Sequence, residues 1–241
     1  MRLAKKYVMK NIGIYIIILL LFSCSGKEQK DSDLVAYWSF DDTTSVAVNK
    51  GIGIGFIVLN KGARHADGYR GKAMKFDGSS VLQVEYNPLL DSFSRGITVA
   101  AWIKKDTASY WNTIVSREID STWSEYIGLA VFRNHALFSV DPDGKRYLNT
   151  MDTSKLIPNK WIHLAGTYDN DTLKLYVNGI FIRSAFCKGP LVFQDKNPLF
   201  IGGNSNDKNH STVDCFKGSI DELRIYKRAL GEPEIKSLLN Q

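Results

Sequence analysis

The carboxylate of Asp221 lies in the stretch GSIDELRIY, residues 218–226, whose composition predicts a β-strand. Side chains alternate between the two faces of a strand, so Asp221 should share a face with Leu223 and Ile225. An unpaired charge on such an apolar face costs several kcal/mol. Coordination of Ca²⁺, which takes about six to eight oxygen ligands, would offset that cost. Two alternatives stay open: Asp221 caps a turn, or a β-bulge at Asp221 and Glu222 turns it toward solvent.

Aromatic residues gather among polar ones in residues 105–126. They are Tyr110, Trp111, Trp123 and Tyr126. An aromatic ring beside polar groups suits stacking on the face of a sugar, so these four residues are the predicted ligand-binding set. Packing in the core is the alternative for each of them.

The elements that must position these residues are short segments of alternating hydrophobicity, rich in β-branched and aromatic residues. We predict strands at residues 34–40, 72–76, 81–86, 97–104, 113–117, 126–132, 136–140, 161–168, 172–177, 181–186, 199–202 and 216–226. Asn178-Gly179 predicts a two-residue hairpin turn, since both positions take positive φ. Only the C-terminus has a helical pattern, beginning near Pro233. The fold class is therefore all-β, an antiparallel two-sheet jelly-roll sandwich with a short C-terminal helix.

The first residues carry the pattern of an export signal, residues 1–23. Four basic residues precede an apolar run at residues 12–22, which is about half of the roughly 20 residues that a spanning helix needs. Residues 21–24, Leu-Phe-Ser-Cys, resemble the lipobox of bacterial lipoproteins. The resemblance implies acylation of Cys24 and attachment to a membrane through this lipid anchor only. An ordinary signal peptide with an incidental cysteine is the alternative.

The remaining chain divides into a polar tether at residues 24–33 and one domain at residues 34–241. This organisation places the protein in the bacterial cell envelope as a lipoprotein, with the outer membrane as the expected site and the domain in the periplasm or at the cell surface. A disulfide between Cys187 and Cys215 suits an exported chain, and two separate buried thiols suit it equally.

Charge argues against nucleic acid as a partner. The whole chain has 31 basic and 25 acidic residues, and removal of residues 1–23 leaves 27 basic residues against the same 25 acidic ones. A nearly neutral domain has no basic footprint for a polyanion.

Four pieces of the chain resemble the laminin-G-like jelly rolls of the concanavalin A-like lectin and glucanase superfamily. They are LVAYWSFDD, GKAMKFDGSSVLQV, WIHLAGTYDNDTLKLYVNG and FKGSIDELRIYKRAL, in the family's order. The resemblance implies two curved antiparallel sheets and carbohydrate or protein ligands at loop rims or on the concave face. It also implies a calcium ion near the chain ends. Asp41 and Asp42 would then join Asp221 around one structural calcium ion.

The same superfamily contains glucanases, which place acidic residues on one strand face in roughly an E-x-D-x-E arrangement. The nearest match, residues 118–122, has Thr122 at the third acidic position, and Glu125 has the wrong parity. A non-catalytic carbohydrate-binding lipoprotein is therefore the predicted function, with a glycan as the partner. A protein-binding or adhesion module that recognises a surface protein is the first alternative, and a glycoside hydrolase or lyase is the second.

Overall fold

The computed structural model describes residues 31–42, 46–47, 57–59, 62–84, 86–106, 110–119, 125–143, 147–205 and 212–241, which form one unit. The export signal, Cys24 and the tether before residue 31 lie outside them, and so does Trp123. No helix in the described ranges is long and apolar enough to cross a membrane.

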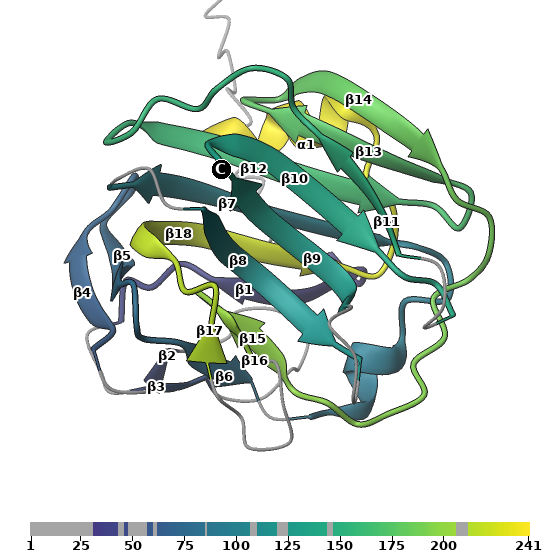
Figure 1. The fold of residues 1–241 in the computed structure, drawn as a ribbon, viewed down its shortest axis with the longest axis horizontal. Helices are drawn as coiled ribbons and strands as arrows, with labels where there is room; N and C mark the ends of the chain where they lie inside the picture. Colours follow the sequence, from purple (N-terminus) through teal and green to yellow (C-terminus); the bar gives the residue numbers. More distant parts are fainter. Residues whose placement is uncertain are drawn as a thin grey trace, which may run out of the picture. The chain divides into compact units, whose positions relative to one another are not determined.

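Two antiparallel sheets make up most of this unit (Figure 1). Sheet A has the order β14 (Ile180–Phe186), β13 (Thr172–Val177), β12 (Trp161–Tyr168), β7 (Ile97–Lys105), β18 (Lys217–Tyr226), β5 (Lys72–Asp77) and β4 (Arg64–Asp67), and β1 (Leu34–Trp38) pairs with β18. Sheet B has the order β11 (Leu148–Met151), β10 (His135–Val140), β9 (Glu125–Phe132), β8 (Trp111–Glu118), β15 (Leu199–Ile201), β6 (Leu82–Val84), β3 (Ile57–Leu59) and β2 (Val46–Ala47). A separate pair joins β16 (Asn204–Ser205) to β17 (Thr212–Val213).

The predicted fold class is confirmed: the two sheets stack on a core formed by the apolar residues that alternate along the strands. In β7, Val99, Ala101 and Ile103 belong to the main core, while Trp102 and Lys104 alternate with them and lie on the outer face of sheet A. All twelve predicted strands are present. The sequence does not predict β2, β3, β4, β11, β16 and β17, because two to four residues are too few to show an alternation.

The first and last strands of the described part of the chain lie side by side in sheet A. Strand β1 pairs with β18, with Leu34 opposite Tyr226. The predicted C-terminal helix is α1 (Glu232–Ser237), followed by the 3₁₀ turn η2 (Leu238–Asn240). Ile235 and Leu238 pack on the outer face of sheet A, against Tyr226 among others. A 3₁₀ helix, η1 (Pro88–Asp91), lies between β6 and β7.

A β-bulge in β18 decides where Asp221 points. Asp221 pairs with Trp102 and Arg224 pairs with Ala100, so β18 uses three steps where β7 uses two. Glu222 takes the extra position with a φ of +52°. The predicted face of Asp221 is therefore wrong: it lies on the outer face of sheet A, opposite the core side to which Leu223 belongs.

A second bulge acts in the same way on β9. Ile127 pairs with Arg117, and Glu125 pairs with the next residue, Glu118, so one residue of β9 is inserted. Tyr126 and Ile127 both belong to the core as a result. Glu125 is thereby directed to the outer face of sheet B.

Candidate functional site

The outer face of sheet B carries an aromatic cluster at the start of β8. Tyr110 is 58% exposed, and its ring meets Phe132 edge-on at 4.9 Å between centroids. Trp111 lies 4.6 Å from the same Phe132 ring. The side chain of Arg133 contacts Tyr110: its guanidinium lies 4.7 Å from the Tyr110 ring centroid and donates an N–H to the Tyr110 hydroxyl at 3.1 Å. Two of the four predicted ligand-binding residues, Tyr110 and Trp111, are thus adjacent and at the surface.

Tyr126 does not belong to this surface, and its predicted ligand contact is wrong. The bulge in β9 turns its side chain into the core, where it is fully buried. Its hydroxyl accepts the backbone N–H of Gln194 at 3.0 Å and donates to Asp195 at 3.3 Å. These bonds satisfy the buried hydroxyl group. Tyr126 therefore packs in the core, which was the alternative to ligand contact.

A polar group occupies the opposite end of β9 on the same face. The hydroxyl of Ser139 donates to the Glu125 carboxylate at 2.7 Å. Gly128 leaves the room for this contact, since a Cβ there would lie 2.0 Å from Glu125 Oε1. Tyr147 adds a hydroxyl that hydrogen-bonds Ser139. Glu125, Ser139 and Tyr147 were not predicted as site residues. The signal for them was Gly128, because an isolated glycine inside a strand indicates that another group approaches closely.

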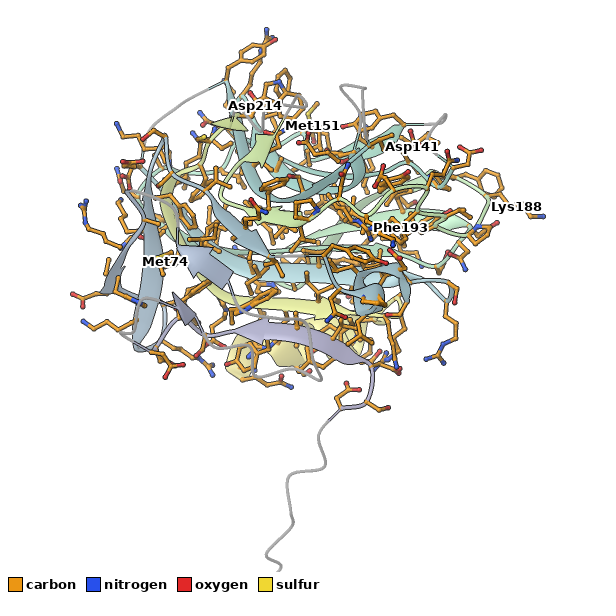
Figure 2. All side chains as sticks on the ribbon, turned by 90° about the horizontal axis from the view of Figure 1, so that it is seen from below. Met74, Asp141, Met151, Lys188, Phe193 and Asp214 are labelled. Carbon is orange, nitrogen blue, oxygen red and sulfur yellow. The ribbon has the colours of Figure 1, made fainter. Side chains whose placement is uncertain are left out.

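Asp214 is a second acid beside sheet B, attached near the start of β8, and its charge acts on Glu125. Its backbone carbonyl accepts the N–H of Thr113 in β8 at 2.9 Å, which fixes the segment before β18 against sheet B. Figure 2 labels Asp214 and Met151, which lie on the same side of the sandwich. Met151 pairs with Leu137 of β10, the neighbouring strand of β9 in sheet B.

The two acids hold their protons more tightly than isolated carboxyl groups. Burial is the main cause that raises the pKa of Glu125 from its ordinary 4.5 to about 7; the Ser139 hydrogen bond opposes this shift and the negative charge of Asp214 adds to it. Burial also raises the pKa of Asp214, against a hydrogen bond from Asn204. Near pH 7 the Glu125 carboxyl group is therefore partly protonated and offers a hydrogen-bond donor as well as acceptors.

The aromatic cluster and the polar group lie on one strand, with Phe132 four residues from Gly128. At about 3.3 Å per residue they stand on the order of 13 Å apart along β9. Such a face can stack a ring against apolar CH groups at one end and hydrogen-bond hydroxyl groups at the other. That combination suits an extended polar ligand.

The predicted calcium ligands divide between two sides of one loop, residues 68–72. Asp221 is fully buried, and its carboxylate accepts the backbone N–H groups of Arg70 at 3.0 Å and Glu222 at 2.7 Å. From the other side, Asp41 Oδ1 accepts the N–H of Lys72 at 3.0 Å. Asp221 therefore caps this loop, as one alternative foresaw, and the bulge does not turn it to solvent.

The side chains near this loop do not by themselves provide a complete set of calcium ligands. Burial raises the pKa of Asp221 to about 7, and the N–H bond from Arg70 lowers it in part. Asp42 follows Asp41 and is half-buried. Within the described ranges no three acidic, histidine or cysteine side chains gather as a metal site. Calcium at Asp41, Asp42 and Asp221 stays a prediction, in which backbone carbonyls would have to complete the ligand set.

No disulfide joins Cys187 to Cys215, both of which the structure describes. Cys187 is buried and donates its N–H to Asp171 beside β13, in sheet A. Cys215 forms a bridge with Thr113 of β8, in sheet B. Each cysteine is held to a different sheet, so the structure does not support the predicted disulfide; Cys187 is buried, as the alternative of two buried thiols expects, whereas Cys215 is half-buried.

Residues 76–236 match the model of a domain family in the concanavalin A-like lectin/glucanases superfamily. Mouse pappalysin-1 is 31% identical over 105 residues, which is 42% of this chain and 6% of pappalysin-1; the human protein is 30% identical over the same length. The chain therefore matches only a small part of these curated relatives.

Solved structures share the fold along most of the chain. Domain 4 of AbnA, an extracellular arabinanase from Geobacillus stearothermophilus solved with arabinotriose, superposes with a TM-score of 0.64 and 24% identity, over 86% of this chain and 98% of that domain. The binding domain of Paraclostridial Mosquitocidal Protein 1 gives 0.67 and 16%, over 86% of this chain and 52% of that one. A structure of botulinum neurotoxin type C, described as interacting with two ganglioside molecules, gives 0.65 and 14%, over 86% and 51%. These similarities establish the fold.

Proposed function

The chain belongs to the concanavalin A-like lectin/glucanases superfamily, and we propose that it is a non-catalytic carbohydrate-binding lipoprotein of the bacterial cell envelope. The observation that carries the proposal is the aromatic cluster of the exposed Tyr110 and the half-buried Trp111 on the same sheet face as the polar group at Glu125. Aromatic platforms with nearby hydrogen-bonding groups are typical of sugar sites.

Two of the solved structures support this reading. Domain 4 of AbnA was solved in complex with arabinotriose, and cell entry of botulinum neurotoxin type C is described as dependent on two ganglioside molecules. For this chain we propose capture: the rings of Tyr110 and Trp111 hold the apolar face of a sugar, and Glu125, Ser139 and Asp214 bind hydroxyl groups of the same chain. An acyl group on Cys24 would keep the domain at the membrane.

A hydrolase is the alternative that one observation favours, because Glu125 and Asp214 lie close enough for the charge of Asp214 to affect Glu125. A retaining or inverting glycosidase needs two carboxyl groups whose environments push their pKa values apart. Here burial raises both pKa values in the same direction, whereas that mechanism needs them pushed apart. Capture without cleavage is therefore the better proposal.

A glycan array tests the proposal, run with calcium and with chelator on the wild type, Trp111→Ala and Tyr126→Phe. We expect the wild type and Tyr126→Phe to bind the same glycans and Trp111→Ala to lose them. A protein partner in pull-downs with no glycan signal would instead favour the adhesion module. Release of reducing ends from a bound polysaccharide would establish the hydrolase.

Cys24→Ala tests the anchor separately from the ligand. We expect the wild type in the membrane fraction and Cys24→Ala in the soluble fraction after export, with glycan binding unchanged. Equal distribution of the two proteins would contradict the lipid anchor and leave the binding proposal to its own test.

A further inference from the structure

A second aromatic surface lies on the outer face of sheet A, on the other side of the sandwich. Tyr69, in the loop between β4 and β5, stacks on Trp102 of β7 with 3.5 Å between centroids and 12° between planes. Trp161 of β12 meets Tyr69 edge-on at 6.3 Å. We call Tyr69, Trp102 and Trp161, with the flanking Arg70 and Lys104, the Tyr69 surface.

The Tyr69 ring is held in place by the loop that carries it. Asp221 accepts backbone N–H groups of both Tyr69 and Arg70, the second at 3.0 Å. The loop passes so close that a Cβ on Gly68 would lie 2.6 Å from Asp221 Oδ2. A ring fixed before a ligand arrives loses little conformational entropy on binding, which favours affinity.

One face of this stack is open and the other is buried. Tyr69 is 38% exposed, whereas Trp102 beneath it is only 7% exposed. A single aromatic ring lying flat on a second ring presents a level apolar platform to solvent. The apolar face of a sugar ring is matched to such a platform.

Polar atoms without partners lie under the platform. In the described part of the chain, the indole Nε1 of Trp102 and both ring nitrogens of His163 are buried with no hydrogen-bond partner. The His163 ring, 1% exposed, lies 5.3 Å from Trp102. Since Trp102 and His163 are almost inaccessible, Tyr69 is the ring of this stack that a ligand can reach.

Two cations flank the platform. Lys104 Nζ lies 5.0 Å from the centroid of Trp161, and the Arg70 guanidinium lies 5.9 Å from that of Tyr69. The nearby Lys72 is already paired with Asp67 at 2.9 Å, and the Arg70 guanidinium donates to the backbone carbonyl of Leu239 at 3.3 Å, a neutral group that leaves its charge in place. Positive charge therefore remains at two edges of the aromatic platform.

We propose that the Tyr69 surface is a second glycan-binding site that takes an acidic saccharide, whose sugar ring stacks on Tyr69 and whose carboxylate or sulfate binds Lys104 and Arg70. Charge-assisted hydrogen bonds to an anion are stronger than neutral ones, which gives the two cations the role of selecting acidic over neutral sugar units. The site lies on a different sheet from the face proposed above and does not depend on it.

Polygalacturonate and its fully methyl-esterified form test the proposal, because they share the same rings and differ in charge. Binding of each polymer to the full-length protein is measured by tryptophan fluorescence or affinity electrophoresis. We expect the acid to bind at least about tenfold more tightly than the ester. Tyr69→Ala should weaken binding of the acid about tenfold, and Lys104→Ala should bring its affinity close to that of the ester.

Matched variants separate this site from folding effects and from the first site. Tyr69→Phe keeps the ring and should keep binding, while Trp111→Ala on sheet B should leave polygalacturonate binding unchanged. Thermal unfolding of each variant checks that the fold persists. Equal affinity for the acid and its ester, or full binding by a folded Tyr69→Ala, would overturn the proposal. A loss of polygalacturonate binding in Trp111→Ala alone would assign the acidic ligand to sheet B and overturn it as well.

Discussion

The carboxylate of Asp221 accepts the backbone N–H of Arg70 at 3.0 Å across a separation of 151 residues. This bond ties the last strand of sheet A to the loop between β4 and β5. It explains how a buried acid is tolerated in β18, since backbone N–H groups replace the water that the charge loses. It also fixes Tyr69, the neighbour of Arg70, over Trp102.

Asp221→Ala should destabilise the protein by about 2 kcal/mol, because it leaves buried N–H groups of Arg70 and Glu222 without an acceptor. Urea unfolding measures the change. Asp67→Ala is the matched control: its side chain is 94% exposed and paired only with Lys72, so the loss should be below about 1 kcal/mol. Equal effects of the two variants would contradict the capping role.

Gly128→Ala should abolish binding on sheet B while the fold persists. A Cβ at this position would lie 2.0 Å from Glu125 Oε1 and 2.4 Å from the Ser139 hydroxyl, so the hydrogen bond between them must break. The affinity for the array-selected glycan reports the effect. Gly231→Ala is the control, since its Cβ would meet nothing closer than 3.6 Å. Unchanged binding by Gly128→Ala would remove the polar group from the site.

The sandwich could be predicted from the sequence because its signal is repeated in every long strand. The alternation of apolar and polar residues in long strands such as β7 and β12 indicates repeatedly which side chains face the core. Asn178-Gly179 forms the predicted turn between β13 and β14. A local error in one strand does not disturb a pattern that many strands share.

The positions of the site residues could not be predicted in the same way, because each depends on a single bulge. Strict alternation places Asp221 on the core face with Leu223, and it would place Glu125 on the core face with Ile127. One inserted residue in each strand reverses both assignments. A bulge is visible only in the register against the neighbouring strand, and the sequence of one strand does not contain that register. Tyr110 and Trp111 were predicted as aromatic residues among polar ones, a criterion that does not depend on strand register.

Glu125 should make stability depend on pH. Its pKa is about 7 in the folded protein and near 4.5 when unfolded, so the folded state binds more protons between these values. The free energy of unfolding should therefore fall as pH rises from about 4.5 to 7. Glu125→Gln should reduce this fall by up to about 3 kcal/mol, measured by urea unfolding across the range. An identical pH profile for Glu125→Gln and wild type would show that the carboxyl group is not held protonated.

Calcium at Asp41, Asp42 and Asp221 predicts a thermal shift. At a concentration about 100 times Kd a ligand stabilises the folded state by about 2.7 kcal/mol, which raises Tm by roughly 5 to 10 °C for a domain of this size. Chelator should reverse the shift, and Asp41→Asn should reduce it. Magnesium at the same concentration is the control. A Tm that is the same with calcium and with chelator would mean that the backbone N–H groups alone satisfy Asp221.

The most direct test of the proposed function is calorimetric titration of an array-selected glycan into the wild type and Trp111→Ala. The account predicts saturable binding by the wild type and at least about a tenfold loss of affinity in Trp111→Ala, with Tyr126→Phe binding like the wild type. Equal affinities of wild type and folded Trp111→Ala would contradict the assignment of the outer face of sheet B as the glycan site.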